Sequence, residues 1–265
     1  MRRLLILWAA LALLEGCSRQ EKAPAASPVD AGSALSKPEP LPTLPETPPQ
    51  PPPIPERAME LHAQGRKQAS AGQYDEALKS YQQAREEAPN WPIPLYDIGL
   101  TYLHLKDNAK ALETYEQLDT QAPQGVSDSK RMLDSLRREK DGRVPPGTLG
   151  EFVEVMQLRE PAEIRQRLEA LSKKAPNFVP AWQELAMSSD KSEESERLSN
   201  KALSLEPDAE TRGELLVFQA TWQWRRGEKA TARKQLQALL DDPATPPSVA
   251  LKARELLNTP ENVTP

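Results

Sequence analysis

Apolar and small residues between residues 57 and 123 recur at helical spacing, and the whole pattern then repeats. A shift of 34 residues (99 minus 65) brings the second copy onto the first. The superposed pairs are Gly65 with Gly99, Ala77 with Ala111, Tyr81 with Tyr115 and Pro89 with Pro123. A fixed period of this size indicates stacked helix–turn–helix units. The pattern therefore predicts two consecutive helix hairpins.

Glycines and alanines in this stretch indicate where the helices meet. Gly65 and Gly99 fall in mid-helix, where glycine costs about 1 kcal/mol relative to alanine. We therefore expect a neighbouring helix to approach each glycine closely, with Ala77 and Ala111 on the opposing side. Gly72 suits the left-handed conformation that ends a helix.

These positions resemble the tetratricopeptide repeat (TPR) family. The large–small–aromatic pattern of that family is met by Leu61, Gly65, Ala77, Tyr81, Ala84 and Pro89, and again by Leu95, Gly99, Tyr102, Ala111, Tyr115 and Pro123. The chain departs from the pattern at Lys106, where the family usually has Gly, and at Leu118, where it usually has Ala. The resemblance implies an all-α fold, a TPR-type α-solenoid of antiparallel helix hairpins. Stacked hairpins of this kind bury a continuous core.

The remaining sequence predicts further helices in less regular repeats. Helical spacing over 127–140, with Ser127 as N-cap, predicts an extra helix that completes a first block, residues 56–141. Residues 142–265 predict three degenerate TPR-like hairpins and a C-terminal capping helix over 248–258.

The break over residues 143–147 admits two interpretations. It is either the most flexible point of the chain or a long loop within one unbroken solenoid.

Pro161 is expected as the first helical residue of its helix, where its missing N–H does no harm.

The start of the chain predicts export. A basic start is followed by an apolar run over residues 4–14, which is too short to span a bilayer and is typical of a signal peptide. The sequence Leu-Glu-Gly-Cys at its end resembles a bacterial lipobox, although Glu15 departs from it. The resemblance implies a lipoprotein signal peptide over residues 1–17 and lipidation of Cys17. Ordinary cleavage nearby, which leaves a free thiol, is the alternative.

Residues 18–55 predict a disordered proline-rich tether. The segment has no aromatic residue, so it lacks the apolar area that offsets ordering entropy. Ser18 follows the cysteine, and by resemblance to bacterial sorting rules this implies the outer membrane. We therefore expect a lipid-anchored protein of the bacterial cell envelope that faces the periplasm.

In the TPR family the first helix of each hairpin lines a concave groove. The resemblance places these partner-binding positions at His62, Arg66, Tyr96, Leu100, His104, Met156, Met187, Thr221, Trp224 and Arg225. Such a surface suits an amphipathic helix or an extended apolar segment of a partner protein. Alternatively, several of these residues are core, or the extra helix of the chain covers them.

Trp222 and Trp224 lie about 200° apart on a helix, so only one of them can face the core.

Composition argues against catalysis and against most ligands. The net charge is −5, which gives no reason to expect nucleic acid, and the single cysteine excludes an intramolecular disulfide. The two histidines fall in different repeats, whereas a metal site needs three or four ligands. Paired carboxylates are expected on solvated helix faces. We expect no metal, no cofactor and no small-molecule substrate.

The sequence therefore favours a non-catalytic protein-binding scaffold in the envelope. By resemblance, anchored TPR proteins of this build help to assemble outer-membrane machines such as a pilus secretin. An adaptor that regulates peptidoglycan enzymes is the alternative, and an enzyme subunit with its own active site is a third class.

Overall fold

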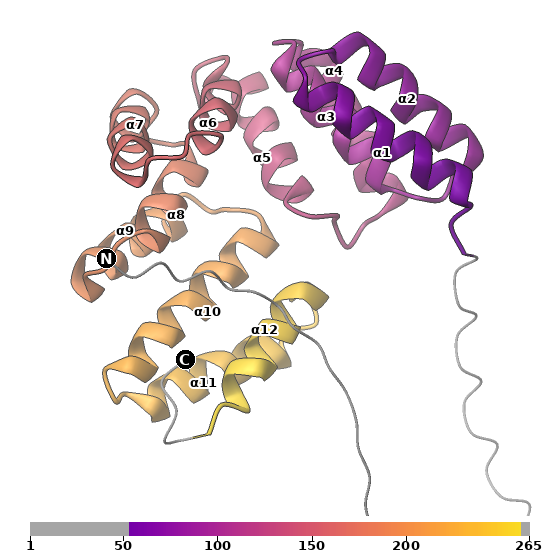
Figure 1. The fold of residues 1–265 in the computed structure, drawn as a ribbon. Coiled ribbons are helices and arrows are strands. Elements are labelled where there is room, and N and C mark those ends of the chain that lie inside the picture. The colour runs from indigo at the N-terminus through magenta and orange to yellow at the C-terminus, as the bar shows by residue number, and fades with distance from the viewer. Residues whose placement is uncertain (1–52, 261–265) are drawn as a thin grey trace, which may run out of the picture. The chain divides into compact units, whose positions relative to one another are not determined.

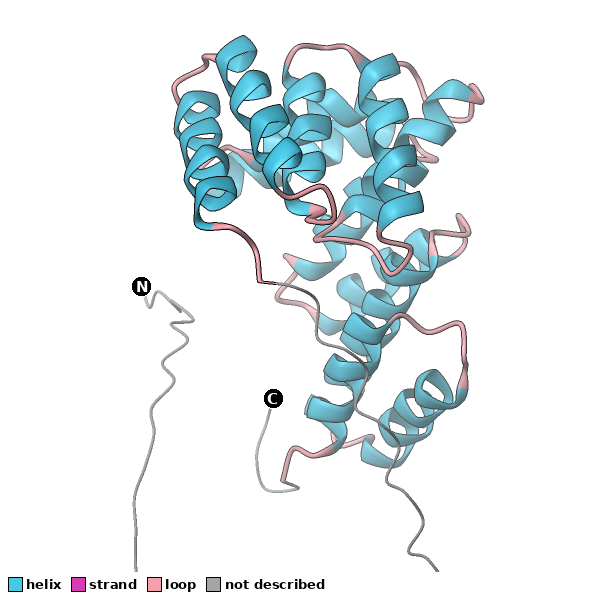
Figure 2. Ribbon diagram, turned by 90° about the vertical axis from the view of Figure 1, so that its right-hand side faces the viewer, coloured by secondary structure: helices cyan, strands magenta, loops and turns pink. Residues whose placement is uncertain are grey.

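The computed structural model describes residues 53–260, which belong to one compact unit, and every regular element in that range is an α-helix (Figures 1 and 2). Cys17 and nearly all of the predicted tether lie outside the described residues. The helices are α1 (Glu56–Ser70), α2 (Tyr74–Glu87), α3 (Ile93–His104), α4 (Asn108–Gln121), α5 (Ser129–Lys140), α6 (Thr148–Met156), α7 (Pro161–Lys174), α8 (Val179–Met187), α9 (Ser192–Leu203), α10 (Ala209–Arg225), α11 (Lys229–Asp241) and α12 (Pro247–Leu257).

Consecutive helices pair as hairpins, and each hairpin packs on the next. The hairpins α1–α2, α3–α4, α8–α9 and α10–α11 have the most extensive contacts, and α2, α4, α7 and α11 also contact the helix that follows each of them. This confirms the predicted all-α fold of stacked helix hairpins. Proline begins helices as expected, since Pro161 is the first residue of α7.

Gly65 and Gly99 each face a tyrosine ring rather than an alanine. A Cβ atom added at Gly65 would lie 2.5 Å from Cε1 of Tyr81, and one added at Gly99 would lie 2.8 Å from Cε2 of Tyr115. The expectation that Ala77 and Ala111 are the opposing atoms is therefore wrong. Each tyrosine lies one turn further along the second helix and covers the glycine with its ring. Packing of Tyr81 and Tyr115 between helices, as predicted, is confirmed.

Gly72 has the expected left-handed conformation, but the start of α5 differs from the prediction. Gly72 has φ 76° and Gly227 has φ 83°, the left-handed region in which glycine is favoured. Ser127, predicted as the N-cap of the next helix, is left-handed with φ 50°, and Asp128 precedes α5 instead. Asp128 makes no capping bond because its carboxylate binds Tyr96 and Arg131. The hydroxyl of Ser129 accepts from the backbone N–H of Val126 instead.

The main core runs across the break that separates the two predicted blocks. One cluster of buried side chains extends from Leu95 in α3 to Leu198 in α9, and it includes Val144 within the break. Glu139 anchors the same segment. One of its oxygens accepts from Leu149 N at 2.6 Å, and the other accepts from Gly147 N at 2.8 Å. The backbone of this connection is thus bound to α5.

Replacing Gly65 with alanine tests the glycine–tyrosine contact. Helix propensity alone favours alanine by about 1 kcal/mol. The clash with the buried Tyr81 ring predicts the opposite sign, a loss of about 1–3 kcal/mol in the free energy of unfolding. Urea unfolding measures it. Gln64→Ala, at an exposed position of α1, is the control and should change stability little. A Gly65→Ala protein as stable as the wild type or more stable would contradict the contact.

Candidate functional site

A network of charged hydrogen bonds links α3, α5 and α8 through the start of α5. The hydroxyl of Tyr96 in α3 donates to Oδ1 of Asp128 at 2.5 Å. The guanidinium of Arg131 donates to the other oxygen of Asp128 at 2.6 Å and to Oε1 of Glu184 in α8 at 2.8 Å. Arg131 thus binds both carboxylates, and these two bonds fix the position of its guanidinium.

The network continues from α8 to the last helices. The buried side chain of Gln183 donates to Oε2 of Glu214 in α10 at 3.1 Å. Lys252 in α12 pairs with the other oxygen of Glu214. One turn earlier on α10, Oε1 of Glu210 accepts from the hydroxyl of Ser248 at 2.8 Å.

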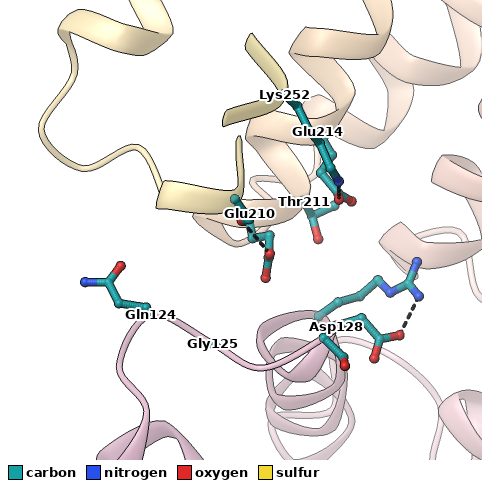
Figure 3. A pocket seen from close by; sticks show the side chains of 10 residues that line it. Gln124, Gly125, Asp128, Glu210, Thr211, Glu214 and Lys252 are labelled. Carbon is teal, nitrogen blue, oxygen red and sulfur yellow. Dashed lines mark hydrogen bonds and ion pairs between the residues drawn. The ribbon is translucent and has the colours of Figure 1, made fainter. Parts of the chain in front are cut away.

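A cavity of about 440 Å³ opens beside these groups. Figure 3 shows Glu210, Thr211, Glu214 and Lys252 on one side of it, with Gln124, Gly125 and Asp128 on the other. The second group belongs to the connection between α4 and α5. The cavity therefore lies between segments more than 80 residues apart in sequence (210 minus 128).

Local sequence positions both walls of the cavity. Oδ1 of Asp208 accepts from the backbone N–H groups of Glu210 and Thr211 at 3.0 and 3.1 Å, and this caps α10. Glu210 and Glu214, four residues apart on this helix, then lie on the same face. On the opposite wall Gly125 has φ 85°, and an added Cβ would lie 3.4 Å from Oε2 of Glu210.

The charges in the cavity are unequally satisfied. Burial raises the pKa of Glu210, the hydrogen bond from Ser248 opposes this rise, and the nearby carboxylates of Glu214 and Asp208 add to it. Within the described part of the chain, its Oε2 is buried and has no hydrogen-bond partner. Burial by itself would lower the pKa of Arg131, but Asp128 and Glu184 outweigh it and raise the pKa. The cavity is thus lined by a fixed cation, Arg131, and by the carboxyl group of Glu210, whose ionisation is disfavoured.

Tyr96 acts in this network as a hydrogen-bond donor. Burial raises its pKa, and the neighbouring carboxylate of Asp128 raises it further. The phenol therefore stays protonated at neutral pH. Among the residues described, no group of three or more His, Cys, Asp or Glu side chains is arranged to hold a metal ion. The arrangement suits hydrogen bonding and charge pairing with a docked polar group.

The ten predicted groove residues fall into three classes of exposure. The exposed residues are Arg66, Met156, Met187 and Arg225, the half-buried residues are Tyr96, Leu100, His104 and Thr221, and the buried residues are His62 and Trp224. Of these ten residues, Tyr96 alone makes a hydrogen bond within the network just described, and Thr221 donates to the carbonyl of Val217 in its own helix.

His62 is a buried contact between α1 and α3 rather than a groove residue. His62 is 8% exposed, and its Nε2 is 2.6 Å from Oδ2 of Asp97. The ring of Trp91 meets it edge-on at 4.9 Å. The prediction of an open groove position is wrong because the rings of Trp91 and Tyr81 and the carboxylate of Asp97 enclose the imidazole.

Trp224 is also core. It is 2% exposed and packs in a cluster with Ala220, Leu236 and Ala253 from α10, α11 and α12. Its prediction as a groove residue is wrong because α12 covers that face of α10. Trp222, two residues earlier, is only partly buried, which confirms that one of the two tryptophans faces inward.

His104 lies at the end of α3 in a half-buried contact. Its ring stacks on Tyr74 at 5.3 Å with an angle of 8°, and Nε2 lies 3.1 Å from Nε2 of Gln157. Burial lowers its pKa, and Glu154 opposes the shift. This residue links the first turn of α2 to the region after α6, away from the cavity residues.

Sequence reasoning missed most of the cavity. Asp128, Arg131, Glu210, Glu214 and Lys252 are charged residues of the kind expected on solvated faces. Two signals were present. The spacing of Asp128 and Arg131 allows an ion pair within one helical turn, and Glu210 and Glu214 fall one turn apart. Neither signal identifies a partner on another helix.

Comparison with known proteins identifies the repeat. Residues 68–136 match the family described as tetratricopeptide repeat. No curated protein matches the chain in sequence. No helix within residues 53–260 combines the length and apolar character needed to cross a bilayer.

Several solved TPR structures resemble the chain at low identity. A thermophilic TPR protein of Thermus thermophilus is 17% identical, with a TM-score of 0.34, and covers 76% of this chain and 98% of its own. PilW, a type IV pilus biogenesis factor, is 15% identical, with a TM-score of 0.35, and covers 77% of this chain and 100% of its own. The TPR2AB domain of yeast Sti1, solved with pHSP90, is 19% identical, with a TM-score of 0.31, and covers 76% of this chain and 92% of its own. At these TM-scores the similarity carries no argument about function.

Replacing Glu210 with glutamine tests the electrostatics of the cavity. Because the folded state raises the pKa of Glu210, this group favours folding below its ordinary pKa of 4.5, and the contribution is lost as pH rises through the folded-state value. Glu210→Gln keeps the shape without the charge. We expect a higher free energy of unfolding at pH 7 and a weaker decline in stability as pH rises from 4.5. Denaturant unfolding across pH measures both.

The matched control for this change is Glu255→Gln, at an exposed position of α12. It should leave the dependence of stability on pH as it is in the wild type. A Glu210→Gln protein that is less stable at pH 7 would show that ionised Glu210 stabilises the fold, contrary to our account.

Proposed function

We propose that this chain, whose residues 68–136 are tetratricopeptide repeats, is a non-catalytic scaffold that docks a segment of a partner protein. The docking face is the cavity between the α4–α5 connection and the first turns of α10 and α12. TPR proteins are in general interaction scaffolds, and this supports the coarse assignment.

The polar network around the cavity is the observation that carries the proposal. Arg131 is held by carboxylates from two elements, and Glu214 is held by Gln183 and Lys252. Groups fixed in this way lose little freedom when a partner binds, so more of the contact energy appears as affinity. The cavity volume of about 440 Å³ falls within the range of ligand pockets and suits a few side chains of a docked segment.

The setting of the scaffold is also part of the proposal. The start of the chain has the features of a lipoprotein signal peptide, with Cys17 as the lipidated residue and residues 18–55 as the tether. A tether of this kind raises the effective concentration of the repeats near other envelope components. We place the protein in the bacterial cell envelope, lipid-anchored and facing the periplasm.

Two partner classes fit this setting. The first is a component of an outer-membrane machine under assembly, such as a pilus secretin. The second is a peptidoglycan enzyme that the scaffold regulates. The proposal includes no nucleic acid and no small-molecule substrate.

Photo-crosslinking in intact cells tests the docking face. A photoreactive residue at Gln124, which is exposed and lines the cavity, should capture a partner. The same residue at Gln82, exposed on α2, is the control and should capture little. Mass spectrometry then distinguishes components of an outer-membrane machine, such as a secretin, from peptidoglycan enzymes. Equal capture at the two positions would count against docking at the cavity.

Replacing Cys17 with serine tests the anchor separately. Serine cannot be lipidated through a thioether, so we expect the protein to move from the membrane fraction to the soluble periplasmic fraction. Immunoblotting of fractionated cells measures this, with Ser18→Ala as the control. An unchanged membrane fraction for Cys17→Ser would contradict lipid anchoring at this residue.

A further inference from the structure

The cavity of about 440 Å³ has more carboxylates than cations on its lining. The carboxylates are those of Asp128, Glu210 and Glu214, and the cations are those of Arg131 and Lys252. The other residues that line the cavity are neutral. When all five charged groups are ionised, the lining therefore carries a net negative charge, which favours a cation as the docked group.

Both cations on the lining are already paired. Arg131 binds the carboxylates of Asp128 and Glu184. Lys252 binds the carboxylate of Glu214. Neither cation is therefore available to neutralise a further carboxylate, and neither offers an uncompensated charge to an incoming anion.

Glu210 is left without a cation among the described residues. Its Oε1 accepts from the neutral hydroxyl of Ser248 at 2.8 Å, and its Oε2 has no hydrogen-bond partner in that part of the chain. Lys130, whose side chain lies beside Gly125 on the opposite wall, pairs with Asp119 instead. Figure 3 shows the carboxylate of Glu210 directed from α10 toward the connection that carries Gly125.

The charge of Glu210 has no evident structural use. Burial raises its pKa, and the carboxylates of Glu214 and Asp208 raise it further, while Ser248 and Lys252 oppose the rise. An ionised carboxylate at this position therefore costs stability. A glutamine would keep the hydrogen bond from Ser248 without that cost. A charged group that weakens the fold in this way is typical of a binding site.

From these charges we propose that the cavity binds a lysine side chain of the docked partner segment, with its ammonium group against the carboxylate of Glu210. The inference rests on the proposed function, because it names the group that the docked segment contributes. The terminal torsion of a glutamate side chain is soft, so a small rotation turns Oε2 toward the ammonium.

The hydrogen bonding of Glu210 favours lysine over arginine. The planar guanidinium of arginine binds best when it meets both oxygens of a carboxylate. Oε1 of Glu210 already accepts from Ser248, so one oxygen has a vacant hydrogen-bonding position. The ammonium of lysine is a compact charge on a flexible stem, and it can bind a single oxygen.

Titration calorimetry with the full-length protein tests the proposal. The probe is a short alanine peptide with blocked ends and one central lysine, so the ammonium is its single charge. Its counterparts carry norleucine or arginine in place of the lysine. The lysine peptide should bind about tenfold more tightly than the norleucine peptide, which corresponds to about 1.4 kcal/mol, and more tightly than the arginine peptide. Added salt should weaken the binding of the lysine peptide.

Glu210→Gln locates the binding. This variant should bind the lysine peptide about tenfold more weakly, at the level of the norleucine peptide. Glu255→Gln, exposed on α12 and outside the cavity lining, is the matched control and should bind like the wild type. Circular dichroism verifies that both variants are folded.

The pH dependence of binding gives a second readout. A protonated carboxyl group has no charge to offer the ammonium, so affinity should fall as pH falls through the folded-state pKa of Glu210. The other charged groups near Glu210 are Asp208 and Glu214 on its own helix, Lys252 on α12 and Lys130 on α5. They are present in Glu210→Gln as well, so the part of the pH dependence that this variant lacks belongs to Glu210.

Three results would overturn the proposal. They are failure of the lysine peptide to bind, equally tight binding of the norleucine peptide, and undiminished binding of the lysine peptide to Glu210→Gln.

Photo-crosslinking from position 124 distinguishes this inference from the proposed function. Capture that is weakened by Glu210→Gln supports both. Capture that is equal in the wild type and in Glu210→Gln contradicts the lysine inference, while docking at the cavity stands. If the wild-type chain captures no partner from this position, the proposed function fails, and the inference that rests on it fails as well.

Discussion

The structure depends on two buried charges, Arg138 and Glu139, that fix α5 in place. Arg138 is 4% exposed and donates to the backbone carbonyls of Leu205 and Glu206 at 2.9 and 2.7 Å, and to Asp134 at 2.6 Å. Glu139 accepts from two backbone N–H groups and from Asn108. A buried charge is tolerated only when its hydrogen bonds are satisfied, because desolvation otherwise outweighs any attraction. These contacts tie α5 to α4, to the start of α6 and to the chain that follows α9.

One wall of the polar cavity follows from the position of α5. Toward α8 and α10, the first turn of α5 presents Asp128 and Arg131, which fix one wall of the polar cavity. Toward α4, Lys140 at the end of α5 lines a separate hollow.

Sequence patterns predicted the repeats well because hairpin packing is local. Gly65 and Tyr81 recur at a fixed period as Gly99 and Tyr115, and this recurrence predicted the order of the first helices and the turns between them. The same patterns gave the wrong partner for Gly65, since spacing along one helix does not say which ring or methyl group reaches across.

The surface was predicted less well because it depends on contacts between distant helices. The resemblance predicted His62 and Trp224 in a groove, but Trp91 encloses the first and α12 covers the second. The partners of Arg131 lie up to 53 residues away, and those of Arg138 up to 68. No local pattern marks such pairs, so charged residues that build the cavity looked like an ordinary solvated face.

Native-state hydrogen exchange of the backbone amides tests the role of α5 most directly. If buried charges fix this helix, its amides over residues 133–140 exchange through the same opening, and with the same free energy, as those of α4 and α8. If α5 were only loosely laid on the repeats, its amides would exchange at a distinctly lower free energy while α4 and α8 stayed protected, and that result would contradict the account.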